Sequence, residues 1–70
     1  METFAQRLKR LRTEKGWSMR ELAKRAGVSY ESVRMWELGR YEPSLFLGEC
    51  VAEALGVSYD YLTWGEELRD

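Results

Sequence analysis

The 70-residue sequence contains no histidine, one cysteine and one proline. A single cysteine cannot form a disulfide within the chain, and without histidine the usual ligand sets of a structural zinc ion are missing. The same absences remove the usual parts of nucleophilic and metal-dependent catalysis. We therefore expect neither an enzyme nor a protein that binds a metal or a cofactor.

Long apolar segments are also absent. No stretch approaches the roughly 20 apolar residues that a membrane-spanning helix needs, and the start METFAQRLKRL does not resemble a targeting segment. We expect a cytoplasmic protein with no membrane partner. If the 70 residues are the whole protein, no second domain remains to sense a small molecule, so no small-molecule ligand is expected.

What the sequence does contain is typical of one small globular domain. Hydrophobic residues make up 44% of the chain and charged residues 33%, which is not the composition of a disordered tail. Residues 1–70 are predicted to form a single domain. Because a core of this size stabilises only marginally, efficient helix packing or dimerisation must supply the rest.

Glycine and hydroxyl residues divide the chain into helical segments. Helices often end at a glycine in the left-handed conformation, and five of the six glycines stand where such an end is expected. Serine or threonine precedes each segment, with Pro43 beside Ser44 at the start of the fourth, and TFAQ and SMRE match the capping-box pattern. No strand alternation competes with this pattern, so we predict an all-α fold. The predicted helices cover about residues 3–15, 18–26, 29–38, 44–55 and 58–64.

The second and third predicted helices are joined by a very short connection. Only Gly27 and Val28 stand before the expected cap Ser29, which forces a sharp corner between two short helices. Val33 and Trp36 follow at helical spacing and are predicted to face the core. These features predict a helix-turn-helix.

The segment SMRELAKRAGVSYESVRMWELGRYEPS resembles the helix-turn-helix of the phage repressor and Cro family, also called the xenobiotic-response-element-like regulators. The small Ala23, the turn residue Gly27, the apolar Val33 and the run WELGR with a following proline all stand at the family's spacing. The resemblance implies a compact five-helix repressor-like domain whose third helix enters the major groove of double-stranded DNA, usually as a homodimer on a palindromic operator. It also implies a prokaryotic or phage origin and association with the nucleoid.

The same resemblance assigns residues to two kinds of DNA contact. The positions that most often reach base edges in the family correspond to Tyr30, Glu31, Ser32 and Met35. A carboxylate can accept from cytosine, a serine hydroxyl can bond to several bases, and tyrosine and methionine can pack on thymine methyl groups. The expected phosphate contacts are Ser18, Met19, Arg34, Arg40 and the backbone of Tyr41. Arg34 can also reach guanine, and Met19 stands where the family commonly has glutamine, whose hydrogen bonds methionine cannot make.

Charge is divided unevenly along the chain. Residues 1–40 carry ten Lys or Arg against five Glu, a net charge of +5, whereas residues 41–70 carry one Arg against seven acids, a net charge of −6. This segregation favours a basic surface on the first half that faces phosphate. Arg12 and Glu37 match a family pair that links the first helix to the end of the third, so a partly buried salt bridge is expected between them.

The fourth predicted helix departs most from the family pattern. Gly48 replaces a large apolar residue and should weaken the helix by about 1 kcal/mol relative to alanine. Phe46 either turns inward to fill the space that Gly48 leaves or stays exposed in a dimer interface. The candidates for that interface are Phe46, Leu47, Tyr59, Tyr61 and Trp64. Cys50 is interpreted as a small packing residue.

Two functions follow from this sequence. The first is a sequence-specific transcriptional regulator of the repressor or controller type. The second is a protein-interaction module, such as an antitoxin or another partner-binding helix-turn-helix protein, which the acidic second half and Met19 would suit.

Overall fold

The computed structural model describes residues 1–66 of the chain, and these fold into five α-helices without a strand. The helices are α1 (Phe4–Glu14), α2 (Met19–Ala26), α3 (Tyr30–Glu37), α4 (Leu45–Leu55) and α5 (Tyr59–Trp64). The all-α fold class predicted from the sequence is therefore confirmed.

A hydroxyl side chain caps the start of every helix. Thr3 forms the complete capping box of α1, because Thr3 and Gln6 each accept a hydrogen bond from the other's backbone N–H. The expected box of α2 is only half formed. Ser18 accepts from the backbone N–H of Glu21, but the Glu21 carboxylate pairs with Arg25 one turn further on. The caps of the other three helices are Ser29, Ser44 and Ser58.

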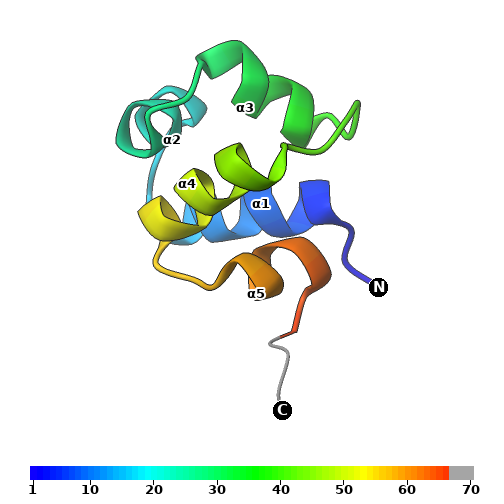
Figure 1. Cartoon of the computed structure of the whole chain (residues 1–70). Helices are drawn as coiled ribbons and strands as arrows, with labels where there is room; N and C mark the ends of the chain where they lie inside the picture. Colours follow the sequence, from blue (N-terminus) through cyan, green and yellow to red (C-terminus); the bar gives the residue numbers. More distant parts are fainter. Residues whose placement is uncertain (67–70) are drawn as a thin grey trace.

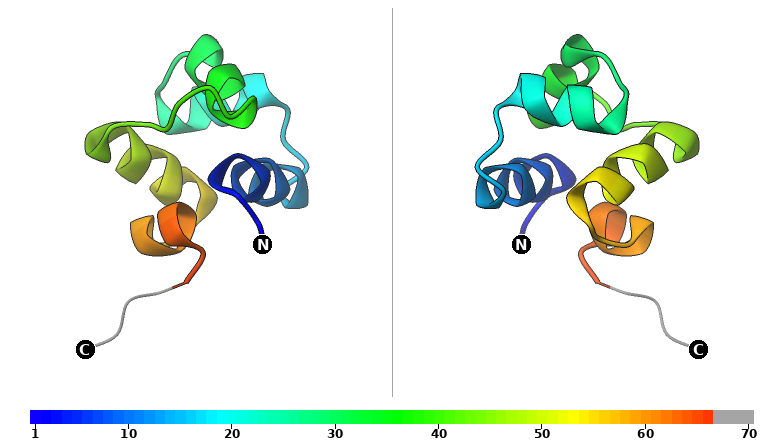
Figure 2. Two further views of the ribbon diagram at one scale, coloured as in Figure 1. Left: turned by 90° about the vertical axis from the view of Figure 1, so that its right-hand side faces the viewer. Right: turned by 90° about the vertical axis from the view of Figure 1, so that its left-hand side faces the viewer.

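The helices surround one small core. In Figure 1, α2 and α3 lie at one end of the molecule, α1 and α4 cross its middle, and α5 lies at the opposite end. The side views agree with this order of the elements (Figure 2). Trp36 is 1% exposed and is the largest fully buried side chain, as expected for a core residue. The other fully buried side chains are Leu8, Leu22, Val33, Val51 and Leu62.

Gly48 in α4 provides space for an aromatic ring from α5. A Cβ atom at Gly48 would lie 2.7 Å from Cε1 of Tyr59, which is too close for real contacts. A side chain at this position would force the Tyr59 ring to move, an effect that helix propensity alone does not describe. Phe46 does not turn inward as one alternative held, since it remains 73% exposed.

Arg7 is a buried cation that the sequence pattern did not reveal. It is 5% exposed, and its Nη1 and Nη2 donate to the carbonyl oxygens of Leu62 and Glu2 over 3.3 and 3.2 Å. Its Nε lies 3.7 Å from the Glu2 carboxylate and has no hydrogen-bond partner among the described residues. Arg7 therefore ties α1 to the end of α5.

No helix in the described part of the chain has the length and apolar character needed to cross a membrane.

Candidate nucleic-acid interface

The corner between α2 and α3 is built by four small or branched residues. Gly27 has a φ of 73°, and the N–H of Val28 donates to the carbonyl of Ala23 over 3.0 Å. Ala23 is 5% exposed in α2, which packs directly against α3. Ser29 then caps α3. This geometry is a helix-turn-helix, and it holds α3 at the end of the molecule away from α5 (Figure 1).

The first turns of α3 carry the residues expected to contact bases. Glu31 is exposed and accepts hydrogen bonds from Arg34 at 3.1 and 3.3 Å. The Ser32 hydroxyl accepts from the Ser29 hydroxyl at 2.8 Å and keeps its own proton available to donate. Met35 is half-buried. The hydrogen bonds that Arg34 donates to Glu31 raise the pKa of this guanidinium, and they hold Arg34 beside Glu31 in the protein without DNA.

The expected ion pair between Arg12 and Glu37 is present. Nε and Nη2 of Arg12 donate to the two carboxylate oxygens of Glu37 over 2.6 and 2.9 Å. The side chains are only 11% and 7% exposed, and Arg12 also donates to the carbonyl of Trp17 over 2.7 Å. These hydrogen bonds with Glu37 raise the pKa of the guanidinium. The pair fixes the end of α3 to α1 and to the loop before α2.

A shallow hollow brings two of the expected phosphate contacts together with a residue that was not anticipated. Its volume is about 210 Å³, and its lining includes Met19, Arg34 and Lys9. Lys9 precedes Arg12 by three residues on α1, and this spacing was the sequence signal that could have placed it on the same face.

The charges of the first half of the chain separate into paired and unpaired groups. Every acid of residues 1–40 forms an ion pair with an arginine of the same segment: Glu2 with Arg7 and Arg10, Glu14 with Arg10, Glu21 with Arg25, Glu31 with Arg34, and Glu37 with Arg12. Among the described residues, the cations of this segment with no such carboxylate partner are Lys9, Lys15, Arg20, Lys24 and Arg40. The net charge of +5 is therefore carried by side chains that remain able to bind an external anion.

The remaining expected phosphate contacts lie at the two ends of the helix-turn-helix. Ser18 is exposed, but its hydroxyl oxygen already accepts the capping hydrogen bond from Glu21. Arg40 and Tyr41 are exposed directly after α3. The backbone N–H of Arg40 donates to the carbonyl of Met35, which holds this turn against the helix.

Two arginines of α2 lie over aromatic rings, which the sequence pattern did not indicate. Arg20 Cζ is 4.1 Å from the centroid of the Tyr30 ring, and Arg25 Cζ is 4.5 Å from that of Trp17. Lys15 approaches the Trp17 ring at 5.8 Å. Such contacts orient a cation without neutralising it.

The five candidates for a dimer interface have different surroundings. Leu47 and Tyr61 pack against the core, and the Tyr61 hydroxyl accepts a hydrogen bond from Arg10 over 2.7 Å. Tyr59 covers Gly48. Only Phe46 and Trp64 among them are exposed large apolar side chains, at 73% and 65%.

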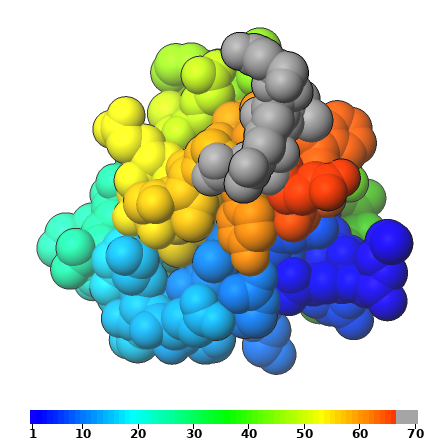
Figure 3. All heavy atoms as spheres, turned by 90° about the horizontal axis from the view of Figure 1, so that it is seen from below, coloured from blue at the N-terminus to red at the C-terminus, as the bar shows by residue number. Residues whose placement is uncertain are grey.

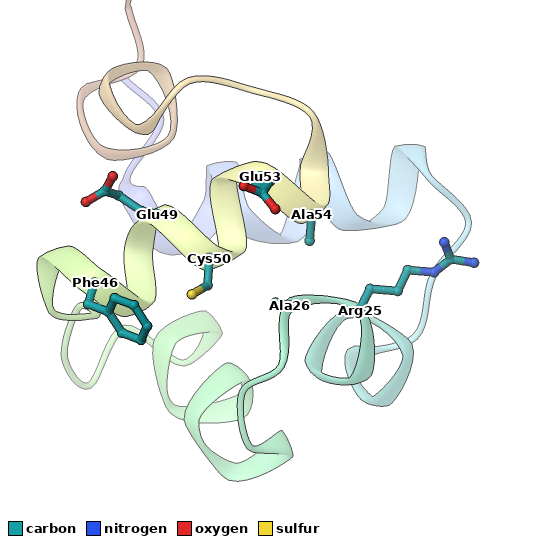
Figure 4. A pocket seen from close by; sticks show the side chains of 7 residues that line it. All are labelled: Arg25, Ala26, Phe46, Glu49, Cys50, Glu53 and Ala54. Carbon is teal, nitrogen blue, oxygen red and sulfur yellow. The ribbon is translucent and has the colours of Figure 1, made fainter.

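Phe46 and Trp64 also line two separate hollows. Phe46 and Cys50 extend from α4 into the hollow of about 340 Å³ between α4 and the end of α2, while Arg25 extends away from Phe46 (Figure 4). Trp64 lines a hollow with Met1 and Arg7 near the chain's start. Figure 3 shows the face opposite α3, where α5 lies beside the end of α4 and the N-terminal residues.

Comparison with known proteins assigns this arrangement to a known group. Residues 8–62 match the family described as helix-turn-helix. The chain is 37% identical over 66 residues, 94% of its length, to the SPbeta prophage-derived HTH-type transcriptional regulator YonR of Bacillus subtilis, and 34% identical over 93% of its length to the HTH-type transcriptional activator BcrR of Enterococcus faecalis. The chain spans 61% of the length of YonR and 32% of that of BcrR.

Solved structures show the same fold. The P22 c2 repressor in complex with a synthetic operator matches with a TM-score of 0.88 at 27% identity, covering 94% of this chain and 100% of that one. SinR in complex with DNA matches with a TM-score of 0.81 at 38% identity, covering 86% and 97%. The restriction-modification controller protein C.AhdI of Aeromonas hydrophila matches with a TM-score of 0.80 at 37% identity, covering 84% and 89%.

Proposed function

Because the chain belongs to the helix-turn-helix family of the repressor and Cro type, we propose that it is a sequence-specific DNA-binding transcriptional regulator. In this proposal α3 enters the major groove of double-stranded DNA, and two copies bind a palindromic operator. Such a regulator acts beside the chromosome, in the cytoplasm of a prokaryotic cell.

The observation that carries the proposal is the pairing of charges in residues 1–40. The acids of this segment are all held by arginines, so five cations are left to face a polyanion. A protein that neutralises phosphates in this way releases counterions, and its affinity falls steeply with salt. The acidic residues of the second half do not prevent this, because the screening length at physiological salt is about 8 Å.

The side chains of α3 support contacts with specific bases, in addition to electrostatic attraction to the phosphates. Glu31 and Ser32 offer an acceptor and a donor at the start of the helix, and Met35 offers an apolar contact one turn later. Arg34 pairs with Glu31 in the protein alone, so binding exchanges this exposed pair for contacts with DNA. Lys9 adds a phosphate contact beside α3 to those expected from the sequence, among them Arg40 directly after the helix.

Two of the similar structures contain DNA, and one of these DNA molecules is an operator. These complexes support the proposal that the present chain binds DNA with the same element. The exposed side chains Leu45 and Phe46, at 62% and 73%, supply apolar surface for the contact between two copies.

The same apolar surface favours a second candidate function, a module that binds another protein. Phe46 stands at the edge of the hollow between α4 and the end of α2, where a partner side chain could insert. SinR, a protein of the same fold, has been solved in complex with the SinI protein. In this second function, the protein partner would bind the apolar surface at Phe46 in place of a second copy of this chain.

Selection of bound sequences from a random duplex library, at two salt concentrations, tests the first function against the second. We expect a palindrome whose half-site centres lie about 10 bp apart. We also expect recovery to fall at the higher salt concentration. Absence of enrichment at low salt would contradict DNA reading and would leave the protein-binding candidate.

A further inference from the structure

The side chain of Arg20, in the first turn of α2, lies on the ring of Tyr30, the first residue of α3. The distance of 4.1 Å between Arg20 Cζ and the ring centroid is that of a close cation–π contact. Tyr30 is half-buried and packs against the core, whereas Arg20 is exposed. A ring held by the core therefore fixes the position of an exposed cation.

This stack leaves the hydrogen-bonding edge of the guanidinium unused. The Tyr30 ring lies against the guanidinium at Cζ, and the N–H donors of an arginine lie in the plane of that group, at its edge. Within residues 1–66, no carboxylate pairs with Arg20. By contrast, Arg25 on the same helix donates from Nε to Glu21 at 2.7 Å. Arg20 is thus an oriented cation with free donors.

The neighbours of Arg20 at the start of α2 do not offer the same chemistry. Met19 has no hydrogen-bond donor in its side chain and packs against the core. Ser18 is engaged in its cap. A charged contact from this turn of α2 to an anion therefore falls to Arg20.

We propose that Arg20 binds a DNA backbone phosphate through the edge of its guanidinium, and that Tyr30 is the platform that aims it. The inference rests on the proposed function, since it places α3 in the groove and Arg20 at the groove's edge, where the phosphates lie. It also changes the role of Tyr30. The ring face that Arg20 covers is closed to a thymine methyl group, so Tyr30 contributes affinity through Arg20.

The test measures the affinity of purified variants for the selected duplex over a series of salt concentrations, by fluorescence anisotropy. Arg20→Ala should weaken binding about tenfold or more, as for loss of one charge-assisted hydrogen bond. It should also reduce the slope of log K against log salt by about 0.9 per bound chain. Arg25→Ala is the matched control, because Arg25 is also an arginine of α2 that lies over an aromatic ring, that of Trp17. The loss of affinity caused by Arg25→Ala should be clearly smaller than that caused by Arg20→Ala.

Two further variants test the platform. Tyr30→Phe keeps the ring and should keep both the affinity and the salt slope. Tyr30→Leu removes the ring and should weaken binding, and combining it with Arg20→Ala should add little further loss, because both act through one contact. Melting temperatures measured alongside would show whether the Arg20→Ala and Tyr30→Leu variants are folded.

The outcomes separate this inference from the function on which it rests. If the wild-type protein binds no duplex, both are overturned. If the wild-type protein binds while Arg20→Ala and Arg25→Ala lose affinity and salt slope equally, Arg20 acts only through net charge and this inference alone is overturned. Fully additive losses for the Tyr30→Leu and Arg20→Ala pair would overturn the platform role.

Discussion

Removal of the Glu37 carboxylate should destabilise the domain far more than removal of an exposed carboxylate. Glu37→Ala would leave Nε and Nη2 of Arg12 without their partners in a site where the arginine side chain is 11% exposed. The hydrogen bond from Arg12 to the Trp17 carbonyl would remain. Breaking a buried ion pair from one side costs about 3–5 kcal/mol. Because this pair retains some exposure, we expect Glu37→Ala to lower the free energy of unfolding by about 3 kcal/mol, at the lower end of this range.

This loss is large for a small domain. A chain of this length has a free energy of unfolding of roughly 4–10 kcal/mol. Each kcal/mol lowers the melting temperature of such a domain by about 4–8 °C, so circular dichroism should record a drop of about 12–24 °C. The double variant Arg12→Met with Glu37→Leu should recover much of the stability, because no charge is then left buried.

Glu21→Ala is the control for this prediction. It removes the acid of an exposed pair with Arg25, in which the side chains are 37% and 52% exposed. Its cost should be about 0.5 kcal/mol or less. A melting temperature of Glu37→Ala no lower than that of Glu21→Ala would refute the reasoning.

Three further predictions concern other parts of the fold. Gly48→Ala should destabilise the protein by about 1 kcal/mol in thermal unfolding, since overpacking against Tyr59 outweighs the gain in helix propensity. In a Tyr59→Ala background, Gly48→Ala should instead stabilise the protein. A stabilising effect of Gly48→Ala alone would contradict the packing of Tyr59 on Gly48. The hydrogen bond from Arg10 lowers the pKa of Glu2 below its ordinary 4.5. The folded state therefore binds fewer protons, and the stabilisation is present above about pH 4.5 and lost as pH falls through the lowered pKa. Glu2→Gln should flatten the acid side of stability against pH, measured by urea unfolding, and an unchanged profile would exclude this pair as the cause. For the proposed homodimer, Phe46→Ser should lower the dimer fraction in sedimentation equilibrium with little change in melting temperature, and an unchanged fraction would contradict an interface at Phe46.

The elements of this fold could be predicted from the sequence because their signals are local. Each helix begins at a hydroxyl cap, and the five glycines expected to end helices all have positive φ. Periodicity likewise identified Val33 and Trp36 as core residues. Such signals depend on residues three or four positions apart, which a single sequence displays directly.

Contacts between distant segments could not be predicted in the same way. The burial of Arg7 depends on the carbonyl of Leu62, 55 residues further along the chain. The place of Tyr59 over Gly48 depends on how α5 returns across α4. The stack of Arg20 on Tyr30 depends on the angle at the turn. In each case the partner is chosen by packing of helices rather than by neighbours in the sequence.

We propose that this protein recognises a particular DNA sequence, and the ratio of its affinities for two duplexes tests this most directly. The dissociation constants of the purified protein for the selected duplex and for a scrambled duplex of the same composition should be compared at physiological salt. We predict that the selected duplex binds at least about 10³-fold more tightly. A ratio near one would contradict sequence-specific recognition.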